Sequence, residues 1–289
     1  MPVDPRLLPL VEETRAFYAT RVAGRGPSSA PELQAVRSGL PAAGPAEVVD
    51  VHGVPLRVHR PPAEPRGVLL EIHGGGFYLG SAAASDVRNR ALADALGVVV
   101  VSVDYRLAPE HPWPAAPDDC EAAALWLVAE GALRFGTAKL ALAGFSAGAT
   151  LAMTTLLRLR DRGVAFGPAV LQFGTYDLSG QTPAGRLIAD EYFLEAYVGS
   201  APDRTVPDIS PIFADLAGLP PVLMVVGEED VLLPDNEAMA TRLSAAGVDV
   251  DLRAYPASPH GFTGHPTPLA AAARGDIETW LSLHLGFIL

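Results

Sequence analysis

Short apolar runs alternate with amphipathic segments along most of the chain, and glycines and prolines mark their ends. The apolar runs predict strands over residues 68–72, 98–103, 140–143, 169–173, 222–226 and 248–255. The segments between and after them predict helices over residues 84–95, 116–130, 146–162, 234–246 and 269–283. Uninterrupted runs such as Val98 to Val101 are typical of strands that helices cover on both faces. The pattern predicts an α/β fold with a mostly parallel central sheet flanked by helices.

Three segments depart from this alternation. The chain opens with a predicted helix over residues 4–22, and residues 24–45 are rich in proline, glycine and serine. Residues 47–51 and 55–59 predict a hairpin that turns at His52-Gly53. Residues 174–208 are long, polar and mixed, and they follow a strand where a crossover helix is expected. This last segment predicts an insertion rather than a plain loop.

Composition narrows the classes of partner. The chain has 289 residues, which suits either two small domains or one large α/β domain. Its 21 basic and 33 acidic residues give a net charge of −12, which would repel nucleic acids and anionic lipid surfaces. Cys120 is the only cysteine, and this excludes an intrachain disulfide, a thiolate zinc cluster and a C-x-x-C redox pair.

The sequence predicts neither an export signal nor a membrane-spanning helix. The longest apolar runs, at residues 98–101 and 221–226, are far shorter than the roughly 20 residues of a membrane-spanning helix. A signal peptide needs an uninterrupted apolar stretch, and the first 18 residues instead contain charges at Asp4, Arg6, Glu12, Glu13 and Arg15. We expect a cytoplasmic protein with no integral membrane contact.

A candidate nucleophile lies between a predicted strand and a predicted helix. Residues 144–148 read Gly-Phe-Ser-Ala-Gly, a G-x-S-x-G pattern centred on Ser146. A serine at such a sharp turn has a strained backbone and an exposed hydroxyl, and Gly144 and Gly148 make room for the close approach of strand and helix. The same pattern can arise by chance in a chain rich in glycine and alanine, but here the strand and the helix are both readable around it.

A glycine-rich turn, His73-Gly74-Gly75-Gly76, follows the strand predicted over residues 68–72. Glycines without a Cβ let backbone N–H groups point together into a cavity, which is what a developing oxyanion needs. We expect Gly75 and Gly76 to donate there together with Ala147, the residue after the nucleophile. A role in cradling phosphate is the competing interpretation, but neither G-K-[ST] nor G-x-G-x-x-G follows.

A serine hydroxyl needs a neighbouring base, and position favours one of the seven histidines. His260 follows the last predicted strand, at the carboxyl edge where sites of open α/β sheets gather. His265 is the nearest rival. His73 is expected to brace the glycine turn, and the others are expected to be packing or surface residues: His52, His59 and His284.

The base in turn needs a carboxylate that fixes its tautomer. Three acids, Glu228, Glu229 and Asp230, follow the strand predicted over residues 222–226, and each lies between the serine and the histidine in the chain. Asp235 is expected to be a first-turn helix acid. The acidic cluster also has a metal-site interpretation, but no histidine or cysteine stands near it at ligand spacing.

Together these motifs resemble the hormone-sensitive-lipase-like branch of the α/β-hydrolases, also called bacterial family IV esterases. Residues 73–77 are similar to the oxyanion-loop signature of that family, and residues 104–116, Asp-Tyr-Arg-Leu-Ala-Pro-Glu-His-Pro-Trp-Pro-Ala-Ala, are the most specific match. The resemblance covers roughly residues 68–262 and assigns the triad to Ser146, Asp230 and His260.

At three positions this chain departs from the usual family pattern. The family usually has Asp before the nucleophile, where this chain has Phe145. It has a further Gly where Ala149 stands, and its acid is often followed by Pro, whereas Val231 follows Asp230. None of these differences removes a triad side chain or an oxyanion donor.

The resemblance also implies a division of the chain. Residues 46–289 would form the α/β-hydrolase core, and residues 1–45 with residues 177–208 would form a helical cap. Such a cap excludes water and forms the acyl pocket, so its loops decide the acyl-chain and stereochemical preference.

The activity that this resemblance implies is a serine carboxylesterase acting on small, short-acyl-chain esters through an acyl-enzyme. No metal or cofactor is implied, the partner is a small-molecule ester rather than a nucleic acid, and a homodimer is compatible with the sequence. One alternative keeps the triad and cleaves an amide, carbamate or formamide. Another is a non-catalytic ligand-binding protein on this scaffold, as in plant hormone receptors that lost the triad histidine; the presence of His260 argues against it.

Overall fold

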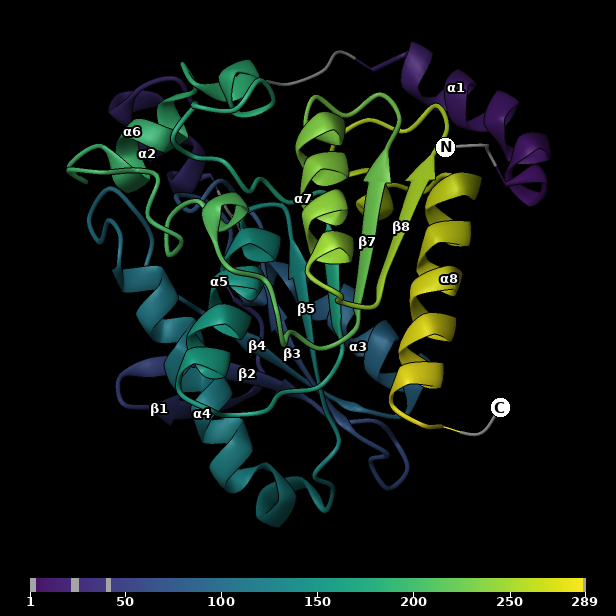
Figure 1. Cartoon of the computed structure of the whole chain (residues 1–289). Coiled ribbons are helices and arrows are strands. Elements are labelled where there is room, and N and C mark those ends of the chain that lie inside the picture. Colours follow the sequence, from purple (N-terminus) through teal and green to yellow (C-terminus); the bar gives the residue numbers. More distant parts are fainter. Residues whose placement is uncertain (1–3, 22–25, 40–42, 288–289) are drawn as a thin grey trace.

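Eight strands form one sheet in the computed structural model, which describes residues 4–21, 26–39 and 43–287 (Figure 1). The spatial order of the strands is β1-β2-β4-β3-β5-β6-β7-β8. Their bounds are β1 Glu47–Val51, β2 Val54–His59, β3 Val68–Ile72, β4 Val99–Val103, β5 Leu140–Phe145, β6 Ala169–Gln172, β7 Val222–Gly227 and β8 Val250–Tyr255.

The sheet is parallel except at one edge. The hairpin of β1 and β2 turns at His52 and Gly53, and β2 pairs antiparallel with β4. From β4 onward every neighbouring pair is parallel, so the carboxyl ends of β3, β5, β6, β7 and β8 meet at one edge. Strands β3, β4 and β7 are buried along their whole length, as the continuous apolar runs predict for a sheet covered on both faces.

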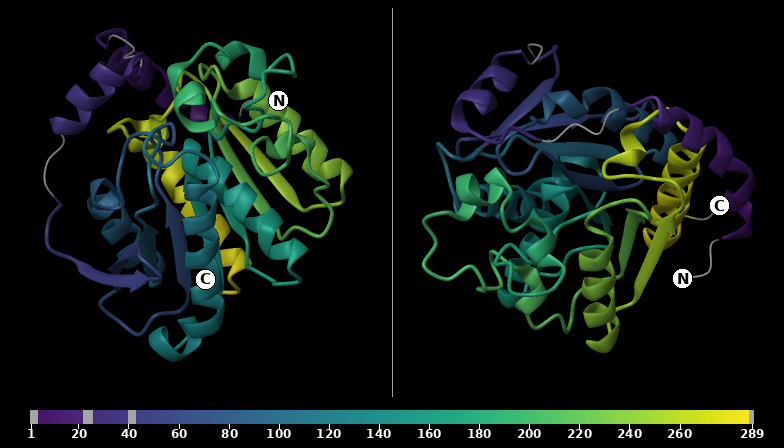
Figure 2. Two further views of the ribbon diagram at one scale, coloured as in Figure 1. Left: turned by 90° about the vertical axis from the view of Figure 1, so that its left-hand side faces the viewer. Right: turned by 90° about the horizontal axis from the view of Figure 1, so that it is seen from above.

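Helices cover both faces of the sheet, and each face has its own apolar core (Figure 2). On one face lie α3 (Asp86–Leu96) and α8 (Pro268–His284). On the other lie α4 (Ala115–Phe135), α5 (Ala147–Asp161) and α7 (Leu233–Ala245). The mostly parallel α/β architecture predicted from the sequence is therefore confirmed.

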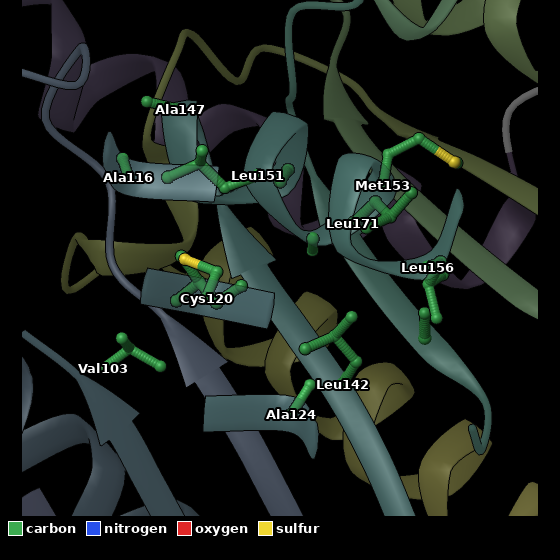
Figure 3. Packing of buried hydrophobic residues seen from close by; sticks show 14 of the residues in the cluster. Val103, Ala116, Cys120, Ala124, Leu142, Ala147, Leu151, Met153, Leu156 and Leu171 are labelled. Carbon is green, nitrogen blue, oxygen red and sulfur yellow. The ribbon is translucent and has the colours of Figure 1, made fainter. Parts of the chain in front are cut away.

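The larger core lies between the sheet and helices α4 and α5 (Figure 3). Cys120 and Ala124 of α4 and Leu151 of α5 pack against Leu142 of β5 and Leu171 of β6, and all five side chains are buried. Small residues on α4 let it approach the sheet closely, and removing a buried leucine from such a core costs about 2–5 kcal/mol. Complete burial also raises the pKa of the Cys120 thiol well above its usual range.

The N-terminal segment packs against two separate parts of the core. A 3₁₀ turn (Pro5–Leu10) leads into α1 (Val11–Ala19), which packs against α8. The prolines at positions 5 and 9 favour the tighter turn over a single long helix. The second helix, α2 (Ala30–Ser38), lies within the stretch rich in proline, glycine and serine, where the sequence indicated no helix.

Helix α2 forms where the chain offers local start signals. Ser29 precedes its first turn with extended backbone, a proline occupies that turn, and the Glu32 carboxylate accepts from the N–H and hydroxyl of Ser28. Arg37, in its last turn, donates to the carbonyls of Tyr78 and Ala108 and so fixes the helix beside the glycine-rich turn.

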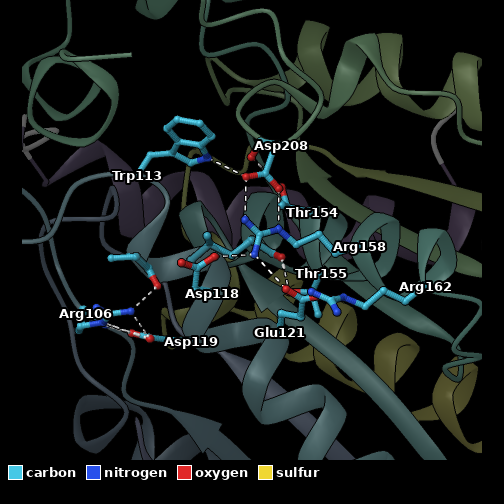
Figure 4. A network of polar contacts seen from close by, with 12 residues as sticks. Arg106, Trp113, Asp118, Asp119, Glu121, Thr154, Thr155, Arg158, Arg162 and Asp208 are labelled. Carbon is cyan, nitrogen blue, oxygen red and sulfur yellow. Dashed lines mark hydrogen bonds and ion pairs between the residues drawn. The ribbon is translucent and has the colours of Figure 1, made fainter. Parts of the chain in front are cut away.

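The insertion between β6 and β7 carries a 3₁₀ turn (Gly185–Ile188) and helix α6 (Tyr192–Val198). Asp208, near its end, accepts from Arg158 of α5 at 2.6 and 2.8 Å and from the Trp113 indole at 2.7 Å (Figure 4). The same guanidinium donates to Asp118 and Glu121 of α4. This network ties the insertion to the two helices of the larger core.

Most predicted helix and strand bounds differ from the observed ones by one or two residues. The main difference is α4, which continues to Phe135 and not 130, because Gly131 and Phe135 are buried and extend its packing surface. Within the described residues, no helix is both long enough and apolar enough to cross a bilayer.

Candidate active site

The segment 144–148 forms a sharp turn from β5 into α5. Ser146 has φ 55° and ψ −121°, a conformation that L side chains rarely adopt, and its N–H donates to the Gln172 carbonyl at 2.9 Å. A Cβ on Gly144 would collide with the backbone of Gly148, and a Cβ on Gly148 would collide with the carbonyl of Ile72. Both glycines are therefore required by close backbone contacts, and the turn presents the hydroxyl of Ser146 at the carboxyl edge of the sheet.

Three side chains from separate loops meet at this turn. The Ser146 hydroxyl lies 2.9 Å from Nε2 of His260, and Nδ1 of His260 lies 2.9 Å from Oδ2 of Asp230. Because a carboxylate only accepts, Nδ1 carries the proton and Nε2 is left to accept from the serine. The Asp230 carboxyl is completely buried, whereas the imidazole is 42% exposed. The arrangement can take a proton from the serine and stabilise the imidazolium that results.

Geometry separates Asp230 from the other two acids of its cluster. Glu228 and Glu229 are exposed, whereas Asp230 is buried and faces the imidazole. Its second oxygen accepts the N–H of Leu232 at 2.9 Å, so both carboxylate oxygens have a partner. Asp235 lies in the first turn of α7, as expected from the sequence, but it is also buried and accepts the N–H of Tyr176 at 2.6 Å.

His265 occupies a different environment from His260. Its Nδ1 lies 2.9 Å from the Tyr18 hydroxyl, and its ring packs against Phe17 and Tyr18 of α1. Burial lowers the pKa of His265, which favours the neutral ring. The structure therefore joins this histidine to the N-terminal helix and not to Ser146.

The glycine-rich turn lies beside the nucleophile. A Cβ on Gly74 would come within 3.2 Å of the Ser146 Cβ and 2.6 Å of the Phe145 carbonyl. Gly75 and Gly76 have φ 125° and 58°, conformations that favour glycine, so the chain reverses beside the serine. Ala147 is the first residue of α5, and its N–H therefore has no carbonyl one helical turn before it.

His73 supports the glycine-rich turn through a ring stack and a hydrogen bond. Its ring stacks on Tyr105 at 4.2 Å between centroids, and its Nδ1 lies 2.8 Å from the Gly74 carbonyl. The Tyr105 hydroxyl donates to the His73 carbonyl at 3.0 Å. Burial lowers the pKa of His73, so the ring is neutral and its Nδ1–H donates to Gly74. This contact holds the glycine turn in place, as expected of His73 from the sequence.

A cavity of about 240 Å³ opens onto the serine. Its wall includes Gly76, Ser146, Ala147 and His260, but Gly75 lies outside it. The rest of the wall comes from the N-terminal segment, the glycine-rich turn, the loop after β6, the insertion and the loop after β7: Gly26, Phe77, Thr175, Ile188, Glu191, Phe193, Val231 and Leu232. The sequence motifs did not identify these wall residues individually. Four of them lie within the segments that the family resemblance assigned to the cap: Gly26, Ile188, Glu191 and Phe193.

A second cavity, of about 410 Å³, lies behind the nucleophile turn on the opposite face of the sheet. Helices α3 and α8 form its sides, and Gly144 and Phe145 belong to its wall. Although it is the larger of the two, neither Ser146 nor His260 lines it. We therefore assign the candidate chemistry to the smaller cavity.

The acidic cluster gives no metal site in the part of the chain that the structure describes. Within residues 4–21, 26–39 and 43–287, no three His, Cys, Asp or Glu side chains are placed to hold a metal ion. Asp230 has both oxygens engaged by His260 and Leu232, and its neighbours Glu228 and Glu229 point to solvent.

Comparison with known proteins agrees with this geometry. A family model described as the alpha/beta hydrolase fold matches residues 69–264. Carboxylesterase NlhH of Mycobacterium tuberculosis is 37% identical over 241 residues, covering 76% of this chain and 75% of that protein. An ethyl acetate hydrolase of Pseudomonas putida is 34% identical, covering 74% of this chain and 72% of the relative.

Solved structures give the same result over nearly the full length. An esterase of Pyrobaculum calidifontis is 32% identical with a TM-score of 0.79, covering 96% of this chain and 97% of the other. A hormone-sensitive lipase from a metagenome library is 31% identical with a TM-score of 0.78, covering 98% and 99%. With the family match spanning two thirds of its length, the chain belongs to the hormone-sensitive-lipase-like esterases, a family of carboxylic ester hydrolases with the α/β-hydrolase fold.

Proposed function

We propose that this protein hydrolyses small carboxylic esters with short acyl chains, through a Ser146-His260-Asp230 triad and an acyl-enzyme intermediate. The observation that carries the proposal is the pair of 2.9 Å contacts that link serine, imidazole and buried carboxylate in one line. That line ends at a cavity large enough for a small substrate, and the backbone at Ser146 is strained to keep the hydroxyl exposed there.

The first half of the reaction forms the acyl-enzyme. Nε2 of His260 takes the proton of the Ser146 hydroxyl as its oxygen attacks the ester carbonyl, and the resulting imidazolium is stabilised by Asp230. The tetrahedral intermediate collapses when His260 gives that proton to the leaving alcohol. In the second half, His260 takes a proton from water, the hydroxide attacks the acyl carbon, and the proton returns to Ser146 as the carboxylic acid leaves.

Backbone donors are proposed to hold the negative charge of both intermediates. The proposed donors are the N–H groups of Gly75, Gly76 and Ala147. Gly76 and Ala147 line the same cavity as the serine, and Gly75 adjoins Gly76 in the turn although it does not itself line the cavity. Gly74 contributes by its small size, because any side chain there would displace Phe145 or Ser146. Fixed N–H groups in a cavity that excludes water are worth about 10²–10³ in turnover per donor.

We also propose that residues 1–45 and 177–208 act as a cap over a core of residues 46–289. The cavity at the serine is also lined by Gly26 of the first segment and by residues of the second: Ile188, Glu191 and Phe193. Arg37 and Tyr192 both approach Tyr78. A cavity of about 240 Å³ that is lined by two such segments favours short acyl groups over long lipid chains.

Replacing Ser146 with alanine tests the assignment. We expect turnover of a chromogenic short-chain ester to fall by roughly 10⁴-fold or more, with an unchanged fold by circular dichroism. A fluorophosphonate should label the wild-type protein at Ser146 and leave the variant unlabelled. Near-normal turnover by purified Ser146→Ala protein would refute the assignment. A series of esters of increasing chain length, assayed on the wild type, tests the acyl preference, which should decline beyond short chains.

A further inference from the structure

The His260 imidazole has only two hydrogen bonds, one at each nitrogen, and it is 42% exposed on a loop after β8. Hydrogen bonds at the two nitrogens leave the ring free to rotate about the axis that joins those nitrogens. A contact on the carbon side of the ring is needed for that, and Phe173 supplies it. Its centroid lies 5.1 Å from the imidazole centroid, with the two planes at 70°.

Phe173 is itself held rigidly. It is fully buried at the end of β6, and its N–H donates to the Val225 carbonyl at 2.7 Å. Its φ is 40°, which costs of order 1–3 kcal/mol for a residue that is not glycine. This backbone aims the ring across the end of the sheet, toward the loop that carries His260.

A second ring supports the first from the side of the nucleophile. Phe145, which precedes Ser146, meets Phe173 edge to face at 4.6 Å between centroids and 87° between planes. The Arg88 guanidinium lies 4.7 Å from the Phe145 centroid. Arg88 is in turn paired with the buried carboxylate of Glu71, so the support for Phe145 is anchored in the sheet.

We propose that Phe173 is a positioning residue that holds the His260 imidazole toward Ser146, and that Phe145 holds Phe173 in place. Phe145 stands where the family usually has Asp, so the aromatic support of Phe173 is a feature of this chain and not of the usual family pattern. The proposal rests on the assigned triad, because a ring can be positioned for catalysis only if His260 is the base. Edge-to-face pairs favour one relative orientation of two rings, and this makes the contact directional.

Leucine at position 173 tests the proposal against a merely structural role. Phe173→Leu keeps the site apolar but removes the ring edge, so we expect kcat to fall roughly 10- to 100-fold while KM changes less than about twofold. The matched control is Phe135→Leu. Phe135 is also buried, but it ends α4 and contacts Trp126 and Arg60, away from the triad. Both variants lose a buried ring, and only the first should lose turnover.

A spectroscopic measurement reports the imidazole directly. The Nδ1–H of His260, bonded to Asp230, should give a proton resonance at very low field in the wild type and in Phe135→Leu. In Phe173→Leu we expect this resonance to broaden or disappear, because the hydrogen bond is held in one geometry for less of the time. An unchanged resonance together with a kcat within twofold of the control overturns the proposal.

Position 145 offers a second test that does not depend on the folding of Phe173→Leu. Phe145 is only partly buried and borders the 410 Å³ cavity, so Phe145→Tyr has room for its hydroxyl and keeps the ring. We expect Phe145→Tyr to keep kcat within about twofold and Phe145→Leu to lose roughly 3- to 10-fold. Equal kcat values for these two variants count against the proposal. If Ser146→Ala is inactive but the aromatic variants are normal, only this inference fails; an active Ser146→Ala protein removes the proposed triad.

Discussion

Two networks of polar side chains join distant parts of this chain, one around Arg158 and one around His260. Arg158 links α5 to α4 and to Asp208 of the insertion, with bonds of 2.6–3.1 Å to three carboxylates. His260 links the loops after β8 and β7 to the nucleophile turn with only two bonds. The Arg158 network therefore has twice as many hydrogen bonds as the His260 network.

The difference between the networks lies in what surrounds them. None of the residues bonded to Arg158 has a positive φ, and none lines either of the two cavities. Ser146, by contrast, has φ 55°, and it shares a cavity with the histidine. A network whose donors and acceptors are satisfied internally holds segments together. A sparse network with strained backbone and an open side is the one suited to chemistry.

Among substitutions that test the difference between the two networks, Asp230→Asn should have the largest effect on turnover. The amide would favour the wrong tautomer of His260, leaving an N–H directed at Ser146, so kcat/KM for a short-chain ester should fall about 10⁴-fold. Glu228→Gln is the matched control two residues away, and its exposed side chain should leave kcat/KM within about twofold. Similar losses in both variants would mean that the acidic cluster acts through its overall charge rather than through Asp230.

Arg158→Met should lower stability and leave turnover largely unchanged. It removes the cation that Asp208 and Glu121 share, although Glu121 keeps its contact with Arg162. Breaking the partly buried pair with Asp208 is expected to lower the free energy of unfolding by about 2–4 kcal/mol. Turnover of the protein that remains folded should stay within a few-fold of wild type. Urea titration and an ester assay at 15 °C measure the two quantities, and a selective loss of turnover would contradict a purely structural role.

The third effect is a pH dependence of stability at Asp235. Burial raises the pKa of this carboxyl to about 6, above the value of an unfolded aspartate. The native state therefore binds the proton more tightly, and the stability this contributes is fully present below about pH 4 and is lost as pH rises through 6. The shift corresponds to about 2–3 kcal/mol. Compared with Asp235→Asn, the wild type should lose several degrees of Tm between pH 4.5 and 7. Parallel Tm profiles would contradict this interpretation.

The sequence predicted those features that depend on local pattern. Continuous apolar runs identified the parallel strands, and the spacing of Gly144 and Gly148 identified a turn whose glycines prove to be sterically required. Helix α2 was missed because its capping residues lie in a segment whose composition is that of a loop, and it is stabilised by Arg37 reaching Tyr78, a contact between distant residues.

The residues that surround the motifs required the structure. Nothing local distinguishes Asp230 from Glu228 by physical chemistry; the difference is that one side chain is buried against a ring 30 residues later. Phe173 likewise has no pattern of its own, because its role depends on the φ that turns it toward His260. Helices, strands and turns are encoded by short stretches of sequence. The packing around the site depends instead on how the strands are arranged in the sheet.

The smallest expected effect concerns the second histidine of the same loop. His265 also makes a 2.9 Å contact, but its partner is the Tyr18 hydroxyl, and among the described residues no carboxylate is hydrogen-bonded to its ring. A neutral hydrogen bond at a partly buried site contributes about 1 kcal/mol, so His265→Asn should lower the free energy of unfolding by no more than that. Turnover should remain within about twofold, whereas His260→Asn should lose it as Ser146→Ala does. If His265→Asn lost turnover as well, the contact between α1 and this loop would be needed to position His260. The two histidines would then not have separate roles, one structural and one catalytic.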